Sequence, residues 1–556
     1  MNRNWWKEAV VYQIYVRSFK DSNGDGIGDL QGIIDQLDYL KWLGIDAIYL
    51  NPINQSPNYD NGYDISDFRA IMEEFGSFDT FERLLAEVHK RDMKLIMDLV
   101  INHTSHEHPW FIESRKNEEN AYRDYYIWKK TEDENPPNNW RSFFGGSAWQ
   151  YDEVTDAYYL HIFAKEQPDL NWENKNVRES IQEMIQFWMN HNVDGFRIDA
   201  INHLAKDTDF PDGTLIGDSD YGNFIKYVQN LPKVHDYISE LRTNVFDASE
   251  KDIVLIGETG GISYDNAHLY TAPNRNELDM TFHFDYHSVG IGKDPWKKIT
   301  IDLVKDLKEK MSGWQNMPEK SGWVPVFYSN HDTTRTVSRL GNDAKYHYES
   351  ATMLALLQLT QRGTPFIYYG DEIGMTNPKD FLLEDYRDIS VQTNYQEKVI
   401  KGKLSEKKFL KGLHLTSRDN SRTPMQWSDE IYAGFSQNEP WIKVNSNYED
   451  INVSKQKEKK ASILNFYRQL IQLRKNNETF IYGSYKDVDF SNEKLYCYYR
   501  KDKKNLFLIC TNFSNKAVAL KKKLQDLEKT LVLSNYSSVA LKMQPYEGRI
   551  YQVTGE

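Results

Sequence analysis

Cysteine and long hydrophobic runs are both scarce in this sequence. Only Cys497 and Cys510 occur among the 556 residues, so the fold cannot depend on a framework of disulfides. No window approaches the length of an apolar membrane span. The N-terminal residues MNRNWWKEAVVYQIYVRSF contain no apolar segment followed by a small-residue cleavage site. We therefore expect a cytoplasmic protein without a membrane segment.

Positive charge is also in deficit. The chain carries 68 Lys and Arg residues against 82 Asp and Glu residues, which gives a formal net charge of −14. This balance argues against nucleic acid and against an anionic membrane surface as partners. Aromatic residues make up 14% of the chain, and such a share is compatible both with stacking on sugar rings and with ordinary core packing.

Apolar segments rich in β-branched and aromatic residues alternate with helical patterns through most of the chain. The helical patterns, such as QGIIDQLDYLKWLG and SFDTFERLLAEVHKR, carry apolar residues at i, i+3 and i+4. No glycine-rich dinucleotide fingerprint is present. The alternation therefore predicts an α/β protein built on a closed (β/α)8 TIM barrel. The expected strands cover residues 9–19, 46–52, 94–103, 194–200, 252–259, 278–286, 323–332 and 365–374.

Two regions depart from this alternation, and the chain is too long for one simple core. Residues 104–173 form a long excursion after the third strand, rich in Trp, Tyr, Asn and Gly, which we expect to be a small domain. From about residue 480, short alternating strands predict an all-β domain. We therefore expect a barrel made of residues 1–103 and 174–479, an inserted domain at 104–173 and a C-terminal β-sandwich at 480–556.

Three of the expected strands end at a carboxylate: VDGFRIDA at Asp199, DIVLIGET at Glu258 and VPVFYSNHD at Asp332. The C-terminal ends of parallel barrel strands meet at one mouth, and such a set of carboxylates can break a glycosidic bond. Arg197 shares a strand face with Asp199, where it would lower the pKa of that carboxyl and keep it ionised as a nucleophile. Glu258 ends an apolar strand, which suits a general acid. A buried structural ion pair is the alternative for Arg197 and Asp199.

The third expected strand carries Asp98, Asn102 and His103 near its end. A histidine at such a position can be a satisfied core residue. Its place beside Asp98, at one more strand terminus of the same barrel, favours a ligand of a sugar hydroxyl.

The segment DSNGDGIGD, residues 21–29, has the spacing of a calcium-binding loop. Side-chain oxygens at positions 1, 3, 5 and 9, a glycine at position 6 and a backbone carbonyl at position 7 match the donors of such loops. The twelfth position is Gly32 rather than Glu, which argues against a helix–loop–helix calcium sensor. A metal site and an Asp/Gly-rich turn without metal are both compatible with this spacing. The candidate ligands are Asp21, Asn23, Asp25, Ile27 through its carbonyl, and Asp29.

The blocks DLVINH, GFRIDA, GET, YSNHD and QPDLN resemble those of the α-amylase superfamily, glycoside hydrolase family 13. The likeness runs nearly end to end, from WWKEAVVYQIYVRSFKDSNGDGIGDL through SPNYDNGYDISD to SRDNSRTPMQW, and more narrowly the chain resembles the oligo-1,6-glucosidase and α-glucosidase branch. The resemblance implies a retaining double displacement, with Asp199 as nucleophile, Glu258 as acid/base and Asp332 as the group that holds the sugar 2-OH and 3-OH. For that geometry the carboxyls of Asp199 and Glu258 lie about 5–5.5 Å apart.

The same resemblance implies a pocket for the terminal glucose of a short oligosaccharide or disaccharide. Asp60 and Arg418 would grip the non-reducing end and close the site, which would make the enzyme exo-acting; Arg422 and Gln167 are weaker candidates. The loop at residues 21–29 resembles a structural Ca²⁺ or Mg²⁺ site of this branch. We expect no organic cofactor, and a monomer or weak homo-oligomer. The implied substrate-binding residues are Asp60, Tyr63, His103, Arg197, Ala200, His331 and Arg418.

The type of glycosidic linkage that the enzyme cleaves is the property that the sequence determines least. Oligo-1,6-glucosidases usually carry Val after the nucleophile, where this chain has Ala200, and His203 and the stretch ETGG also differ from that branch. These departures favour α-1,4 linkages, as in maltose and malto-oligosaccharides, over the α-1,6 linkages cleaved by an oligo-1,6-glucosidase (isomaltase). A trehalose-6-phosphate hydrolase would need a basic pocket, and no cluster of Lys and Arg is evident near the site loops. The Arg-rich loop of a sucrose isomerase is not apparent in DISVQTNYQ, and a non-catalytic transporter subunit would have lost the carboxylates.

Overall fold

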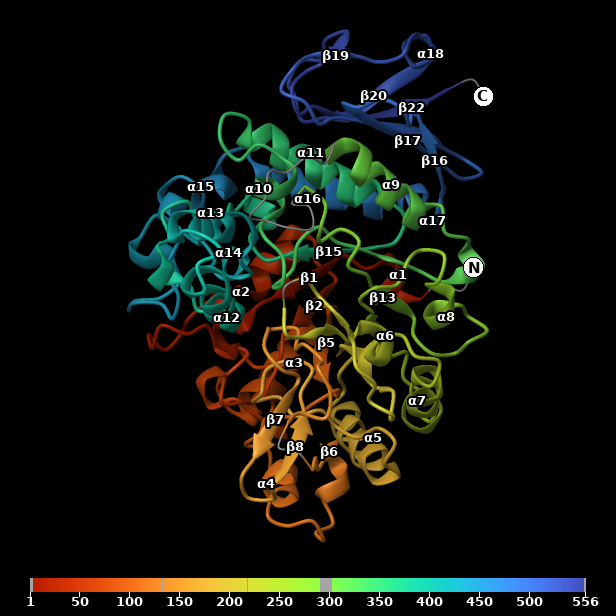
Figure 1. The fold of residues 1–556 in the computed structure, drawn as a ribbon. Coiled ribbons are helices and arrows are strands. Elements are labelled where there is room, and N and C mark those ends of the chain that lie inside the picture. Colours follow the sequence, from red (N-terminus) through yellow and green to blue (C-terminus); the bar gives the residue numbers. More distant parts are fainter. Residues whose placement is uncertain (1–3, 133–134, 218, 291–302, 555–556) are drawn as a thin grey trace.

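The computed structural model describes residues 4–132, 135–217, 219–290 and 303–554, and a barrel of parallel strands lies at its centre (Figure 1). The strands are β1 (Val11–Ile14), β2 (Ala47–Leu50), β5 (Lys94–Val100), β9 (Gly195–Asp199), β12 (Val254–Glu258), β13 (Met280–Phe282), β14 (Pro325–Val326) and β15 (Thr364–Tyr368). They follow one another in chain order around the barrel, and β15 pairs with β1. A parallel bridge between Met280 and Trp323 joins β13 to the segment before β14. The predicted (β/α)8 barrel is confirmed.

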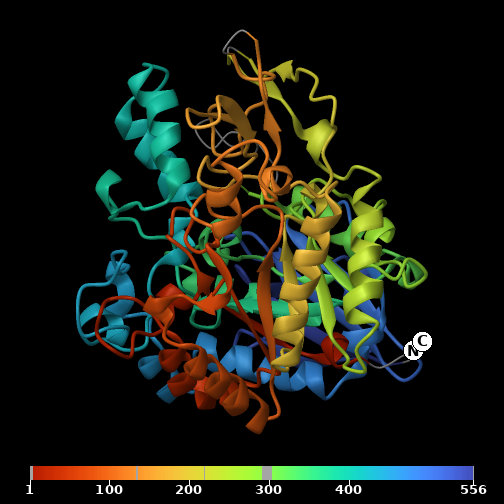
Figure 2. The same ribbon diagram turned by 90° about the horizontal axis from the view of Figure 1, so that it is seen from below.

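Helices surround the barrel and connect its strands (Figure 2). The two helical patterns of the sequence form α2 (Leu30–Leu43) and α3 (Phe78–Lys90). Asp29 caps α2 by accepting a hydrogen bond from the Gly32 N–H, and the helix ends at Gly44, whose φ of 104° favours glycine. Across the described residues, no helix combines the length and the apolar character that a membrane crossing requires. Further outer helices are α5 (Lys175–Asn190), α7 (Val234–Leu241), α9 (Leu303–Gln315), α11 (His347–Thr360) and α16 (Ile463–Lys475).

The side chains inside the barrel come from alternate positions of the strands. An apolar cluster in the interior includes Ile96 of β5 and Ile256 of β12. Two residues further along each strand, the same inward face carries Asp98 and Glu258. The inward-facing side chains of these strands are thus apolar in the middle of the barrel and charged near the C-terminal ends. The inward polar residues of the neighbouring β9 are Arg197 and Asp199.

The segment after β5 builds a small sheet of its own above the mouth of the barrel. Strands β6 (Trp128–Lys129), β7 (Trp149–Asp152) and β8 (Ala157–Leu160) pair antiparallel in the order β6–β8–β7. Its aromatic core also includes Phe210 and Phe224, which lie beyond β9 in the chain. The long excursion is therefore an ordered structure, and part of the segment after β9 packs against it.

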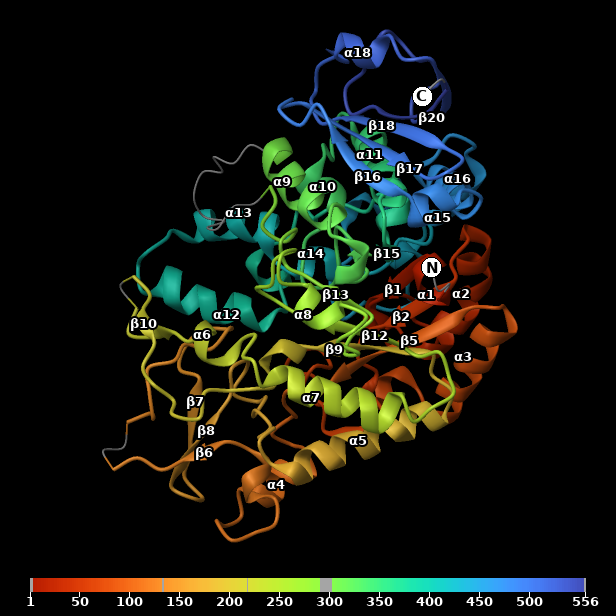
Figure 3. The same cartoon turned by 90° about the vertical axis from the view of Figure 1, so that its right-hand side faces the viewer.

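Helices α12 (Ile389–Tyr395) and α13 (Glu406–Thr416) follow the last barrel strand, β15. Helix α12 lies near the inserted sheet (Figure 3). Arg141 of the inserted segment forms an ion pair with Glu397, just beyond α12, at 2.8 Å. Two loop regions that are distant in the chain therefore meet over the barrel mouth.

The last part of the chain forms an antiparallel sheet on the side of the barrel away from the inserted segment (Figures 1 and 3). Its order is β16–β17–β18–β22–β20, and the alternating pattern of the tail had predicted an all-β unit without its strand order. The Tyr498 hydroxyl lies 2.6 Å from the Thr360 hydroxyl of α11, which ties the sheet to the barrel. Cys497 and Cys510 stand opposite each other on neighbouring strands as free thiols. The strands are β16 (Ser484–Val488), β17 (Leu495–Lys501), β18 (Leu506–Asn512), β20 (Lys529–Ser534) and β22 (Gly548–Val553), with a separate pair β19 (Val518–Ala519) and β21 (Lys542–Met543).

Glu372, just after β15, gives the barrel a pH-dependent stability. Its carboxyl is fully buried and accepts hydrogen bonds from the hydroxyls of Tyr12 and Tyr39 at 2.7 and 2.8 Å, and burial raises its pKa to about 7. Because the folded pKa exceeds the unfolded value, its stabilising effect is full below about pH 4 and is lost as the pH rises through 7. The free energy of unfolding should therefore fall by roughly 3 kcal/mol between pH 4.5 and 8 because of this group, and Glu372→Gln should remove that fall.

Denaturant unfolding at several pH values measures this difference in the free energy of unfolding. Glu384→Gln, an exposed glutamate of the same region, is the matched control and should keep the slope of the unchanged protein. Equal slopes for Glu372→Gln and the unchanged protein would contradict the assignment.

Candidate active site

A pocket of about 420 Å³ lies at the C-terminal mouth of the barrel, which is where this fold places reactive groups. Asp199 and Glu258 are the last residues of β9 and β12, and Asp332 lies in the loop after β14. The structure brings every predicted catalytic and substrate-binding residue except Arg197 into the pocket lining. These residues are Asp60, Tyr63, His103, Asp199, Ala200, Glu258, His331, Asp332 and Arg418.

Arg197 lies beneath the pocket and joins three carboxylates. Its Nη1 donates to Asp98 at 2.8 Å and to Asp199 at 2.7 Å, and its Nη2 donates to Glu258. The register of β5 and β9 sets Asp98 directly beside Arg197. The Ala200 N–H donates to the second oxygen of Glu258 at 3.1 Å. Asp199 and Glu258 are therefore neighbours on one guanidinium, while their predicted separation of about 5–5.5 Å stays a prediction.

The electrostatics of Asp199 differ from the sequence-based expectation. Burial raises the pKa of Asp199 well above its ordinary value, and the nearby charge of Glu258 adds to this, whereas Arg197 acts in the opposite direction. Arg197 cannot outweigh burial, because its single charge is shared with Asp98 and Glu258 as well. Asp199 therefore ionises less readily than the sequence predicted, while two adjacent carboxyls in one pocket can take the separate roles of nucleophile and acid.

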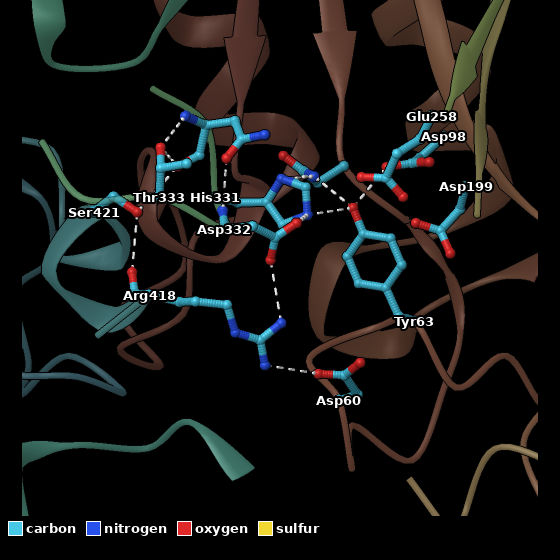
Figure 4. A network of polar contacts seen from close by, with 12 residues as sticks. Asp60, Tyr63, Asp98, Asp199, Glu258, His331, Asp332, Thr333, Arg418 and Ser421 are labelled. Carbon is cyan, nitrogen blue, oxygen red and sulfur yellow. Dashed lines mark hydrogen bonds and ion pairs between the residues drawn. The ribbon is translucent and has the colours of Figure 1, made fainter. Parts of the chain in front are cut away.

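Asp332 has the opposite character. Burial alone would raise its pKa, but His331, Arg418 and Arg422 together hold the pKa well below its ordinary value. The contacts are 3.0 Å to His331, 3.1 Å to Arg418 and 3.3 Å to Arg422, and Figure 4 shows the first two from within the pocket. Asp332 is thus an ionised acceptor at neutral pH, suited to hydroxyl groups or to a developing positive charge.

His331 is oriented from below by two side-chain amides. Its Nδ1 accepts hydrogen bonds from Gln13 and Asn51 at 3.1 and 3.0 Å, so the ring proton is on Nε2. That nitrogen lies 3.0 Å from Asp332 and 2.7 Å from the Tyr63 hydroxyl, and the two rings stack with their centroids 5.2 Å apart (Figure 4). The network presents Tyr63, His331 and Asp332 as one rigid wall.

One end of the pocket is closed by Asp60 and Arg418. Arg418 donates to Asp60 at 3.3 Å and to Asp332 at 3.1 Å (Figure 4), while Asp388 anchors it with contacts of 2.5 and 3.0 Å. The guanidinium also lies over the Phe144 ring, 5.1 Å from its centroid. A substrate chain cannot pass this end unless the Asp60–Arg418 contact opens.

The remaining predicted residues have supporting contacts. The His103 ring borders the pocket, donates from Nε2 to the Tyr63 carbonyl at 2.9 Å and is neutral, because burial lowers its pKa to about 4. Gln167 donates to Asp60 at 3.2 Å and also borders the pocket. Asp98 lies in the middle of β5 rather than at its end and supports Tyr63 at 2.7 Å.

Several pocket residues were not anticipated from the sequence as substrate contacts. The inserted segment supplies aromatic walls, and the loops after β9, β12 and β13 supply further polar and apolar groups. His203 and the ETGG stretch had stood out only as departures from the family branch, and the repeated Phe of FFGGSAWQ is a signal that could have found the aromatic wall. These lining residues are Phe143, Phe144, Phe163, Asn202, His203, Gln229, Gly260, Gly261, Phe284, His287 and Ser390.

The candidate metal loop at residues 21–29 is a tight turn with internal hydrogen bonds. The carboxylates of Asp21 and Asp25 accept from backbone N–H groups of the loop itself, whereas Asp29 caps α2 through Gly32 at 2.7 Å and holds the Ser22 hydroxyl at 2.9 Å. Among the described residues, Asp, Glu, His and Cys side chains form no group of three or more that could hold a metal ion. The oxygen donors of the loop, its Asn and backbone carbonyl included, are nevertheless of the kind that Ca²⁺ and Mg²⁺ prefer.

The fold and the site define a glycoside hydrolase: a (β/α)8 barrel with a carboxyl pair and a third, ionised carboxylate at its mouth. The family model described as "Alpha amylase, catalytic domain" matches residues 13–483. The chain belongs to this α-amylase family, as the sequence blocks indicated.

Curated relatives and solved structures resemble the whole chain. Oligo-1,6-glucosidases of Parageobacillus thermoglucosidasius and Bacillus cereus are each 46% identical to it, and each alignment covers 100% of both chains. A trehalose-6-phosphate hydrolase of Bacillus subtilis (strain 168) is 41% identical over 99% of this chain and 98% of its own. A crystal structure of an isomaltulose synthase mutant from Erwinia rhapontici, in complex with its natural substrate sucrose, superposes with a TM-score of 0.95 at 41% identity and covers 100% of both chains.

Proposed function

We propose that the protein is an exo-acting α-glucosidase that releases glucose from α-1,6-linked short α-glucosides such as isomaltose. The observation that carries this proposal is the 46% identity over the whole length to proteins named oligo-1,6-glucosidase. The pocket that contains Asp199 and Glu258 and is closed at one end by Asp60 and Arg418 agrees with it. The expected preference for α-1,4 linkages is not supported by these relatives. It rested on a few positions, Ala200 first among them, against a likeness that extends over the whole chain.

The proposed reaction is a double displacement. An Asp199 carboxylate oxygen attacks the anomeric carbon of the terminal glucose, and the bond to the leaving-group oxygen breaks as Glu258 gives that oxygen its proton. The ionised Asp332 holds the 2-OH and 3-OH of the distorted sugar. A water molecule then gives a proton to Glu258 and attacks the anomeric carbon, which breaks the ester to Asp199 and restores the α configuration.

Release from the chain end follows from the closed side of the pocket. The contacts among Asp60, Arg418 and Phe144 form a wall at this end of the pocket, and a substrate chain that reaches the wall has to end there. The hydroxyl groups of a non-reducing end are good partners for a carboxylate and a guanidinium. An enzyme built in this way binds chain ends rather than internal segments of a polysaccharide.

The pocket is poorly matched to phosphorylated substrates. Within the described part of its lining, Arg418 is the only Lys or Arg side chain, and it is already paired with Asp60, Asp332 and Asp388. Burial lowers the pKa of His203 and of His287 to about 3, so both rings are neutral. Hydrolysis of trehalose 6-phosphate is therefore disfavoured, although one relative carries that name.

Initial rates on isomaltose, maltose and trehalose 6-phosphate test the proposed linkage. We expect kcat/KM for isomaltose to exceed that for maltose by roughly tenfold, a factor that small differences in pocket contacts can supply. A higher value for maltose would support the second candidate, an α-1,4-glucosidase, which the small Ala200 side chain favours. A higher value for trehalose 6-phosphate would contradict both.

Ala200→Val tests how far the neighbour of the nucleophile sets this preference. Ala200 is 3% exposed and borders the pocket, so two added methyl groups narrow the space where the leaving sugar begins. We expect the isomaltose-to-maltose ratio of kcat/KM to rise by roughly threefold, within the energy of one methyl-sized contact. An unchanged ratio in a variant with unchanged thermal midpoint would exclude Ala200 as a linkage determinant.

We further propose that the loop at residues 21–29 binds a structural Ca²⁺ or Mg²⁺ through Asp21, Asn23, Asp25 and the Ile27 carbonyl, with Asp29 contributing through water. The metal would fix the loop without taking part in catalysis. Removal with EDTA should lower the thermal midpoint by about 3 °C, and Asp21→Ala should abolish the response to added metal. Absence of bound metal by elemental analysis, with no response to EDTA, would contradict this site.

The protein is also proposed to act in the cytoplasm as a monomer or weak homo-oligomer. Its two free, buried thiols fit a reducing compartment.

A further inference from the structure

The pocket draws its lining from two opposite halves of the barrel. Asp60 and Tyr63 follow β2, and Arg418 follows β15, so the closed end lies over the neighbouring strands β2, β1 and β15. Three other lining segments follow β9, β12 and β13, which are neighbours on the opposite side. The leaving sugar of the proposed reaction must therefore lie over this second half. We call Gln229, Gly260, Gly261 and Phe284 the diglycine platform.

The diglycine platform is built around the side chain of Gln229. A Cβ atom at Gly261 would stand 2.3 Å from Gln229 Oε1, and one at Gly260 would stand 3.3 Å from Gln229 Nε2 and 3.4 Å from the Phe284 ring. Any other residue at Gly261 would therefore displace the amide. The two glycines are the ETGG stretch in which the chain departs from the oligo-1,6-glucosidase pattern, and their effect here is to seat Gln229.

The amide of Gln229 is only weakly engaged by the rest of the described chain. Its one side-chain hydrogen bond there runs from Nε2 to Nε2 of His203 at 3.5 Å, a distance at the limit of a hydrogen bond. Phe284 beside it is 37% exposed, and its ring stacks on that of His287 with the centroids 4.4 Å apart. A planar amide with one acceptor and two donors, next to a partly exposed aromatic ring, is suited to a sugar ring with adjacent hydroxyl groups.

We infer that Gln229 is a specificity-determining residue that hydrogen-bonds the hydroxyl groups of the leaving sugar, while the Phe284 ring packs against that sugar. This inference rests on the proposed α-glucosidase function. It adds a recognition site for the second sugar of a disaccharide, held open by Gly260 and Gly261. An aryl leaving group can contact Phe284 but offers no hydroxyl groups to Gln229.

Two variants that act by different routes test this assignment. Gln229→Leu removes the amide, and Gly261→Ala displaces it through the 2.3 Å approach. Each should lower kcat/KM for the preferred disaccharide roughly tenfold, about the effect of one lost hydrogen bond. The value for p-nitrophenyl α-glucoside should stay within about threefold. Gly402→Ala is the matched control, because Gly402 has the same φ of +72° as Gly261 and open space around it.

The outcomes separate this inference from the proposed function. The ratio between disaccharide and aryl substrate is measured on whichever disaccharide the unchanged enzyme prefers, so a preference for maltose alters the proposed linkage and leaves the ratio criterion intact. Equal losses on both substrates would show a structural role for Gln229 and overturn the inference. Unchanged rates on the disaccharide would overturn it as well.

Discussion

Asp199→Ala is expected to lower kcat/KM by roughly 10⁵-fold on every α-glucoside, because the variant lacks the atom that forms the bond to the anomeric carbon. The fold should survive the change, since Arg197 keeps its partners Asp98 and Glu258. Steady-state kinetics with an aryl α-glucoside measures the loss. The exposed Asp265→Ala serves as control and should leave the rate unchanged.

Chemical rescue by azide is a second test of the role of Asp199. The small anion fits the space that the Asp199 side chain leaves and can attack the anomeric carbon in its place. We expect added azide to restore part of the rate of Asp199→Ala and to yield β-glucosyl azide. Residual activity within tenfold of the unchanged enzyme would contradict the role of Asp199, as would an azide product of α configuration.

Removal of the positive charge at Arg418 should have the second largest effect. Arg418 contacts Asp60, Asp332 and Asp388, and it helps to hold the pKa of Asp332 low. In Arg418→Met the pKa of Asp332 rises, so the fraction of ionised Asp332 falls first on the acid side. We expect kcat/KM at pH 7 to fall roughly 10³-fold and the acidic limb of the pH profile to move to higher pH.

Arg418→Lys separates the charge from the geometry. A lysine restores the charge near Asp332 but cannot form the bidentate contact that Arg418 makes with Asp388. The acidic limb should therefore return most of the way to its original pH, while kcat/KM stays reduced. A pH profile of Arg418→Met that coincides with that of the unchanged enzyme would show that Arg418 does not set the ionisation of Asp332.

The strand-end chemistry could be predicted from the sequence because it depends on a simple period. Alternation along a strand places Arg197 and Asp199 on one face, and parallel strands in one barrel bring Asp199 and Glu258 together. Both relations need only local pattern and strand direction. The eight strands, the all-β tail and the grouping of the carboxylates therefore follow from the pattern of residues alone.

The environment of those groups could not be predicted in the same way. Burial raises the pKa of Asp199, and Arg197 does not offset this effect because its guanidinium also pairs with Asp98 and Glu258. A sequence does not show how such a charge is shared. Asp388 anchors Arg418 from a loop that has no periodicity. Phe210 packs on the inserted sheet although it lies beyond β9 in the chain. Each of these contacts depends on loop conformation over long sequence separations.

The preference for one glycosidic linkage could not be predicted from single residues for the same reason. Ala200 and the ETGG stretch were visible departures from a pattern, but their meaning depends on what fills the space beside them. The structure shows Ala200 donating its N–H to Glu258 and Gly261 making room for Gln229. Such roles are positional, and they are decided by neighbours from other strands.

The most direct test of the account is to trap the intermediate on Asp199. Glu258→Gln removes the base that activates water, and α-glucosyl fluoride needs no acid to leave, so the glucosyl-enzyme should accumulate. We predict that mass spectrometry finds one added hexosyl group per chain, located on the peptide that contains Asp199. No covalent adduct, or an adduct on Asp332 instead, would contradict the double displacement proposed here.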